Sequence, residues 1–158
     1  MRRTFFKELY KAMKKNTDIW AISGDLGYGG FDRIRDDFPT RFINVGAAEQ
    51  TGLDIAVGLA LQGKIPFFYS ITPFSLYRPF ETIRTYIDHE NIPVKIIGSG
   101  RRKDYAHDGF SHDATDDKKF MLTFKNIISI WPQTKEGVKD LMYLAVNEQK
   151  PFYINLSR

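Results

Sequence analysis

The sequence predicts a three-layer α/β/α domain built on a mainly parallel six-stranded sheet. Short apolar runs alternate along the chain with segments whose apolar residues recur at the helical period. Apolar strands that alternate with helices are typical of parallel sheets covered on both faces. With 158 residues, of which 42% are hydrophobic and 27% charged, the chain is expected to form one domain over residues 1–158 with a sizeable core.

Six short runs of β-branched and aromatic residues are the expected strands. They are residues 18–23, 41–45, 64–70, 93–98, 126–131 and 152–156. The first run stops at a Gly-Asp-Leu-Gly turn that begins at Gly24, and the fourth is followed by a long polar loop over residues 99–115. Long loops in compact domains are usually functional, so this loop is expected to contribute to a site.

Six segments with apolar residues at the helical period are the expected helices. They are residues 2–15, 31–38, 47–62, 74–89, 116–124 and 135–148. The second is expected to end before Pro39, because the residue before a proline disfavours the helical conformation. The third has very few charged residues after Glu49 and ends at Gly63, a natural C-cap.

The composition excludes several classes of function. The chain has no cysteine, which rules out disulfides, thiolate metal sites and a cysteine nucleophile. The net charge of +4 is mild, and no basic helix or mixed basic and aromatic stretch argues for nucleic acid binding. No apolar run approaches the roughly 20 residues that span a bilayer, and the basic N-terminal segment lacks the apolar stretch of a signal peptide. We therefore expect a cytoplasmic protein that binds neither nucleic acid nor membranes.

Residues that can carry chemistry follow the carboxyl ends of the expected strands. Asp25, Glu49, Phe74, the loop over 99–112 and Arg158 all have this position. In open α/β sheets this edge is where ligands bind, so these residues predict a shared site. Glu49 is the most informative of them, because a carboxylate in the first turn of an apolar helix is poorly solvated and open to chemical tuning.

Six fragments of the sequence carry a resemblance to a known family. They are Gly-Asp-Leu-Gly at 24–27, Phe-Pro-Thr-Arg-Phe at 38–42, Val-Gly-Ala-Ala-Glu-Gln at 45–50, Gly-Leu-Ala-Leu-Gln-Gly-Lys-Ile-Pro-Phe at 58–67, Arg-Pro-Phe-Glu-Thr-Ile-Arg at 78–84 and His-Asp-Gly-Phe-Ser-His-Asp at 107–113. In this order and spacing, the chain resembles, nearly end to end, the pyrimidine-binding domain of transketolases. The resemblance implies the thiamine diphosphate-binding fold for the whole chain.

The resemblance implies a cofactor site around Glu49. In this family the matching glutamate hydrogen-bonds a ring nitrogen of the aminopyrimidine of thiamine diphosphate. It thereby favours the tautomer that takes the proton from the thiazolium carbon. Asp25, Ile71 and Phe74 are expected to contact the cofactor. Ile71 departs from related sequences, which often have phenylalanine there, and Phe74 is the nearest remaining aromatic residue.

The resemblance also implies a substrate site. Asp108 and His112 match catalytic residues that hydrogen-bond hydroxyl groups of the donor sugar, a task suited to groups that accept or donate. Arg2 and Arg158 fall where the family places arginines that bind the substrate phosphate, since the guanidinium fork matches phosphate oxygens. Arg101 could bind a phosphate or nucleotide group as well, or it could belong to a solvated loop.

Three further departures from the family indicate altered recognition. Gly100 replaces a histidine that contacts substrate, and Gly29 stands where many transketolases have a phosphate-contacting serine. His107 replaces a glutamate that belongs to the cofactor contacts or the subunit interface, so subunit pairing there could differ. Arg101, Arg102 and Lys103 add positive charge beside the missing histidine, which we interpret as a sign of altered substrate recognition.

The resemblance implies that this chain needs a partner. In the family a Gly-Asp-Gly motif followed by asparagine, on a separate domain, holds the metal ion that binds the diphosphate, and this chain has no such motif. We therefore expect the small subunit of a split enzyme, with no metal site of its own. A large subunit would bind the diphosphate with Mg²⁺ or Ca²⁺, in a heterodimer or in an assembly with two copies of each chain.

The expected reaction is transfer of a two-carbon ketol unit from a ketose, which we expect to be phosphorylated, to an aldose. Two alternatives stay open. A pyruvate-type donor would undergo decarboxylation and acyl transfer, as in deoxyxylulose phosphate synthases. A non-catalytic regulatory subunit of the same fold is the other.

Overall fold

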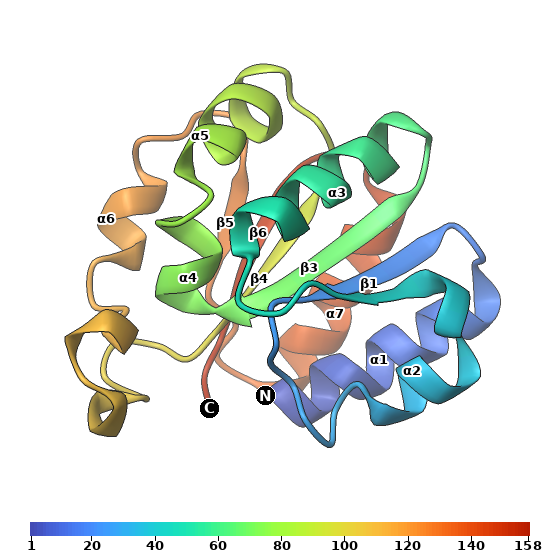
Figure 1. Ribbon diagram of the computed structural model, residues 1–158, viewed down its shortest axis with the longest axis horizontal. Coiled ribbons are helices and arrows are strands. Elements are labelled where there is room, and N and C mark those ends of the chain that lie inside the picture. Colours follow the sequence, from blue (N-terminus) through green and yellow to red (C-terminus); the bar gives the residue numbers. More distant parts are fainter.

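The computed structural model describes residues 1–158 as one sheet between two layers of helices (Figure 1). All six strands are parallel and lie in the order β2-β1-β3-β4-β6-β5. They are β1 (Ile19–Ser23), β2 (Phe42–Asn44), β3 (Ile65–Ile71), β4 (Lys95–Ser99), β5 (Ile128–Ile130) and β6 (Phe152–Leu156). The predicted fold class is confirmed, and the sheet is entirely rather than mainly parallel.

The helices divide between the two faces of the sheet. They are α1 (Arg2–Lys15), α2 (Asp32–Asp37), α3 (Glu49–Leu61), α4 (Thr72–Leu76), α5 (Phe80–Thr82), α6 (Asp117–Met121) and α7 (Lys135–Asn147), with shorter turns η1 (Pro39–Arg41), η3 (Ala106–Asp108) and η4 (Phe110–His112) and a π-helix, η2 (Ile83–His89). Helices α1, α2 and α7 cover one face, and α3, α4, α6 and η2 cover the other. None of these helices is long and apolar enough to span a bilayer.

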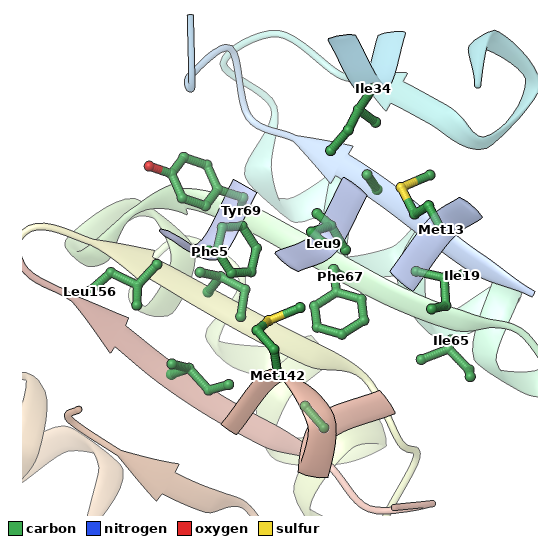
Figure 2. Packing of buried hydrophobic residues seen from close by; sticks show 14 of the residues in the cluster. Phe5, Leu9, Met13, Ile19, Ile34, Ile65, Phe67, Tyr69, Met142 and Leu156 are labelled. Carbon is green, nitrogen blue, oxygen red and sulfur yellow. The ribbon is translucent and has the colours of Figure 1, made fainter. Parts of the chain in front are cut away.

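The central strand β3 shows how one sequence fills two cores. Phe67 and Tyr69 are buried in the cluster beneath α1, while Phe68 lies in the cluster beneath α3. Figure 2 shows Phe67 and Tyr69 packed beside Phe5 and Leu9 of α1. Successive side chains of a strand point to opposite faces, so an unbroken apolar run is what a strand buried on both faces requires.

The prediction of a single helix over residues 74–89 is wrong. The structure divides this segment into α4, a turn at Tyr77–Pro79, the short α5 and the π-helix η2. Pro79 has no N–H to donate and disfavours the helical conformation at the residue before it, Arg78. The helical period of the apolar residues therefore continues across a break that the proline imposes. The helix expected over 116–124 is also shorter, and forms only as α6.

Candidate active site

The carboxyl ends of the strands bring most of the predicted site residues to one rim. β1 ends before Asp25, β2 leads through a short turn to Glu49, and β3 ends at Ile71, just before α4 and Phe74. β4 leads into the loop that contains His112. The geometry that the sequence predicted for open α/β sheets is therefore present on this edge.

Glu49 is buried at the start of α3, with 2% of its surface exposed. Its Oε2 accepts a hydrogen bond of 2.6 Å from Nη1 of Arg78, which is also an ion pair. Its Oε1 accepts a longer one, 3.3 Å, from the hydroxyl of Ser70 at the end of β3. A buried carboxylate is costly unless it is paired and hydrogen-bonded, and both oxygens of Glu49 meet that condition.

The backbone next to Glu49 leaves just enough room for this arrangement. A Cβ at Gly24 would lie 3.0 Å from Oγ of Ser70 and 3.1 Å from Cγ of Glu49. The turn after β1 therefore packs tightly against Glu49, and a side chain at Gly24 would press on the groups around the carboxylate. Helix α3 is held against β3 by buried apolar residues such as Leu53 and Ala56, which fixes the direction in which its first residue points.

Arg78 connects Glu49 to an aromatic stack. Its guanidinium lies over the ring of Phe74, 3.9 Å from the centroid, and the ring of His112 meets Phe74 edge-on at 4.8 Å. The structure thus brings together Glu49, Phe74 and His112, three residues predicted separately from sequence. Arg78 was not predicted as a site residue, although it opens one of the family-like motifs, and its position just before Pro79 was the available signal.

The other predicted residues lie further out. Asp108 is exposed and contacts Nε2 of His107 at 3.2 Å. Asp25 is also exposed, and it accepts a 3.2 Å hydrogen bond from the hydroxyl of Tyr28, which raises the pKa of that tyrosine. Ile71 is half-buried as the last residue of β3. The structure holds no group of three or more histidine, aspartate or glutamate side chains that could bind a metal ion.

A basic hollow lies on the same rim, beside α1 and the turn after β1. It has a volume of about 730 Å³, and its lining contains five cationic side chains and no carboxylate. These cations are Arg2, Arg3, Lys7, Arg33 and Arg158. We call this hollow the arginine pocket. Asp37 contacts Arg33 and Tyr10 from outside this lining, but positive charge remains in excess, which suits an anionic ligand.

Tyr105 forms one wall of the arginine pocket and was missed by the sequence analysis. Nη1 of Arg2 donates a 2.9 Å hydrogen bond to its hydroxyl, and the guanidinium of Arg158 lies 5.1 Å from its ring centroid. Burial raises the pKa of Tyr69, a neighbouring tyrosine whose hydroxyl has no hydrogen-bond partner. Ser99 and Arg2 lower the same pKa, but by less than burial raises it.

Arg101 does not join Arg2 and Arg158. Its guanidinium donates to Oδ1 of Asn155 at 3.1 Å and to the Asn155 carbonyl at 2.7 Å. Burial lowers the pKa of Arg101, but these acceptors and nearby acids keep the group charged and fixed. It lines a separate hollow together with Arg102, Lys103 and Lys118. Most of its donors tie the 99–115 loop to β6, so this arginine is positioned as a structural link.

Comparison with known proteins decides the family. The family model described as "Transketolase, pyrimidine binding domain" matches residues 1–158. This chain belongs to the transketolase pyrimidine-binding domain family. The "Putative transketolase C-terminal section" of Methanocaldococcus jannaschii is 30% identical to this transketolase domain over 159 residues, covering 100% of the chain and 50% of the relative.

Other relatives of this transketolase domain are also longer than the chain. One of the subunits of the apulose-4-phosphate transketolase of Actinobacillus succinogenes is 32% identical over 76% of the chain and 39% of the relative. A 1-deoxy-D-xylulose-5-phosphate synthase of Dehalococcoides mccartyi is 31% identical over 99% of the chain and 24% of the relative. A solved structure, "Split gene transketolase, inactive beta4 tetramer", matches with a TM-score of 0.86 and 30% identity, over 99% of the chain and 51% of that protein. The chain therefore spans about half or less of the length of these proteins.

Proposed function

We propose that this chain is the small subunit of a split, transketolase-like enzyme that transfers a two-carbon ketol unit from a phosphorylated ketose to an aldose. The observation that carries the proposal is the buried carboxylate of Glu49, held at the ligand-binding edge of the sheet beside Phe74 and His112. Such a carboxylate serves acid–base chemistry because it lies in a water-poor setting with fixed orientation.

The residues around Glu49 fit the aminopyrimidine of thiamine diphosphate, the cofactor of the family. Gly24, which has no side chain, passes close to the carboxylate, and Oε1 has only the 3.3 Å hydrogen bond from Ser70 to exchange. Glu49 would hold a ring nitrogen of the cofactor, while Arg78 keeps Oε2 in place and Phe74 offers an apolar face. When bound, the cofactor supplies the nucleophilic carbon that takes up the two-carbon unit.

The chain's other polar residues would hold the sugar substrate. His112 packs against Phe74 with its Nδ1 3.0 Å from the Ser111 hydroxyl, so its ring orientation is set by two neighbours. It is therefore suited to contact a sugar hydroxyl, with Asp108 further along the same loop. At the other end of the substrate, Arg2 and Arg158 in the arginine pocket would bind the phosphate.

The proposed enzyme needs a large subunit that binds the diphosphate with Mg²⁺ or Ca²⁺, in a heterodimer or in an assembly of two copies of each chain. The relatives described as a C-terminal section, as one subunit of a transketolase and as a split gene transketolase support a divided enzyme. Exposed apolar residues give further support, because large apolar side chains at a surface mark contact sites. They include Tyr77, Phe80, Phe110 and Leu122.

The test is an assay of the chain co-expressed with the diphosphate-binding subunit from the same genome. Two-carbon transfer from ketose phosphates to aldoses should require both chains and thiamine diphosphate. The pair that carries Glu49→Gln, a change of nearly equal size, should bind as a complex and lose the transfer. A complex that forms, binds the cofactor and transfers nothing from any ketose tested would contradict the proposal.

A pyruvate-type donor is the second candidate, favoured by the 31% identity to the deoxyxylulose phosphate synthase over almost the whole chain. The two candidates differ in one product, because a pyruvate donor loses carbon dioxide and a ketose donor does not. Carbon dioxide released from pyruvate, dependent on an aldehyde acceptor, would favour the synthase-like reaction. Transfer from a ketose without gas release would favour the first.

A further inference from the structure

The ring of Tyr105 packs directly against the backbone of Gly100. The ring of Tyr105 lies so close that a Cβ at Gly100 would be 2.4 Å from its Cε2 and 2.5 Å from its Cδ2. Gly100 also has a φ of +89°, which side chains rarely tolerate. Its backbone cannot move aside, because its N–H donates to the Leu156 carbonyl at 2.8 Å and its carbonyl accepts from Thr72. Tyr105 therefore occupies the space that a side chain at position 100 would need in this backbone conformation.

The hydroxyl of Tyr105 joins two groups from distant parts of the chain. It accepts the 2.9 Å hydrogen bond from Arg2, 103 residues away, and it lies 2.9 Å from the hydroxyl of Ser99. Since the Tyr105 oxygen accepts from Arg2, its own hydrogen is free to go to Ser99. Tyr105 is only 7% exposed, so neither contact is easily replaced by water. This chain of hydrogen bonds fixes the direction of the Arg2 guanidinium.

The ring of Tyr105 supports the second arginine. The Arg158 guanidinium lies over it at 5.1 Å, and the Arg158 amide donates a 3.0 Å hydrogen bond to Oδ2 of Asp104, the residue before Tyr105. An arginine over an aromatic face is attracted to the ring. The two arginines come from opposite ends of the sequence, and both contact Tyr105 in the lining of one pocket.

The guanidinium groups of the two arginines are not neutralised by a carboxylate of the chain. Neither forms an ion pair, and no carboxylate lines the arginine pocket. Guanidinium groups pair well with phosphate, through parallel N–H donors. Arg2 donates one Nη1 hydrogen bond to Tyr105, and its remaining N–H groups are available to a ligand.

We propose that Tyr105 is a positioning residue for phosphate: it holds Arg2 and Arg158 so that their guanidinium groups meet a single phosphate in the arginine pocket. It thus acts on the phosphate only through the arginines. The inference deepens the proposed function and rests on it for the identity of the substrate. The positioning role itself belongs to the chain alone and can be tested without partner or cofactor.

The first experiment measures the binding of inorganic phosphate to the full chain. Binding is monitored through the NMR signals of the arginine side-chain N–H groups. Tyr105→Phe keeps the ring and removes the hydroxyl, and we expect a dissociation constant about 5- to 10-fold higher. This is less than the full loss of a hydrogen bond to a charged group, because Tyr105 acts on the phosphate only through the arginines. The control is Tyr143→Phe, which removes an exposed hydroxyl from α7, outside the pocket. Equal affinity in Tyr105→Phe and wild type would overturn the proposal.

A double-mutant cycle separates positioning from a merely structural role. If Tyr105 acts through Arg2, the change Tyr105→Phe should matter little once Arg2→Gln is present, so the effects on phosphate affinity are not additive. Additive effects would show that Tyr105 acts independently of Arg2 and would overturn the proposal. Thermal midpoints of all four proteins, which a structural role alone would shift in parallel with affinity, should change little.

The reconstituted enzyme gives the second readout. Tyr105→Phe should raise KM for a phosphorylated ketose with kcat nearly unchanged, and should leave KM for the unphosphorylated ketose as it is. A fall in kcat for both substrates would contradict the positioning role. Failure of the two-carbon transfer itself would overturn the proposed function only, because phosphate binding by the lone chain is measured separately.

Discussion

Two parts of the same rim differ in how their charges are balanced. Glu49 is enclosed, and each of its oxygens receives a hydrogen bond from a nearby element, β3 or the turn before α5. The arginine pocket is open, contains five cationic side chains and no carboxylate, and depends on a contact between residues 103 positions apart. The buried charge of Glu49 is paired within the chain, whereas the arginine pocket has an excess of positive charge that an anion from outside the chain would balance.

This difference suits the Glu49 region to the chemical step and the arginine pocket to substrate binding. A carboxylate whose orientation is fixed in advance suits a step that must be repeated with the same geometry in every turnover. Under the proposed function, the cations of the arginine pocket gain most from a ligand that brings negative charge, so we expect them to control which substrate binds. Changes near Glu49 should lower kcat, whereas changes in the arginine pocket should raise KM.

The largest effect is expected for Glu49→Gln. An amide of the same shape cannot exchange a proton with the cofactor ring, so turnover of the reconstituted pair should fall about 10²- to 10⁴-fold. The measurement is kcat at saturating substrate and cofactor. Glu81→Gln is the matched control, because Glu81 is exposed and paired with Arg84. Turnover of Glu49→Gln within a factor of two of Glu81→Gln would remove the basis for the chemical role of Glu49.

The next effect is expected for Arg2→Gln, which removes a charged group that we propose donates hydrogen bonds to the substrate phosphate. We expect KM for a phosphorylated ketose to rise about 10- to 100-fold, the range for losing a hydrogen bond between charged groups, with kcat little changed. Arg35→Gln on α2 is the control, since Arg35 is exposed and paired with Asp32 and Asp36. A loss of kcat instead of a rise in KM would show that the two regions do not divide the work as described.

A smaller effect is expected for Arg78→Gln. The carboxylate of Glu49 would keep only the 3.3 Å hydrogen bond from Ser70, so we expect turnover to fall about tenfold through poorer orientation. Ser70→Ala removes the longer of the two hydrogen bonds and should cost less than Arg78→Gln. Steady-state kinetics of both variants check this order, and the reverse order would mean that Ser70 rather than Arg78 holds the carboxylate.

No effect on turnover is expected for Lys95→Met. Lys95 is a buried residue at the other end of β4, away from the candidate site. Its ammonium donates to the carbonyls of Glu148 and Lys150, and burial lowers its pKa from 10.5 to about 8. Between these pH values the unfolded chain holds a proton that the folded chain has lost. The free energy of unfolding should therefore rise with pH over this range, by about 3 kcal/mol at most.

Urea unfolding at pH 8, 9 and 10 tests this prediction for Lys95. Lys95→Met cannot titrate, and it keeps the tyrosines that also respond in this range. The difference in unfolding free energy between wild type and Lys95→Met should shift in favour of wild type as the pH rises. Parallel pH profiles for the two proteins would contradict a depressed pKa of Lys95.

The part of the site around Glu49 could be predicted from sequence because its geometry is local. A strand, a short turn and the first residue of a helix lie within a few positions of one another, and the strand end fixes where the side chain lies. The six strands were predictable for the same reason, since each is an apolar run between clear turn residues. The break at Pro79 was not predicted, because the apolar period of residues 74–89 runs through it.

The arginine pocket was only half predictable. Arg2 and Arg158 were recognised through the family resemblance, but Tyr105 was not, because its partner Arg2 is 103 residues distant. In the same loop, Arg101 was chosen for its charge, whereas the structure uses most of its donors for Asn155 and a neighbouring carbonyl. Charge can be seen in a sequence, but the fit of a ring against a glycine such as Gly100 can be seen only in three dimensions.

The most direct measurement is the rate at which solvent deuterium replaces the proton on the thiazolium carbon of thiamine diphosphate bound to the reconstituted pair. If Glu49 controls the tautomer of the aminopyrimidine, exchange in Glu49→Gln should be at least about 100-fold slower than in wild type, with the cofactor still bound. Equal exchange rates in the two proteins would contradict the role of Glu49.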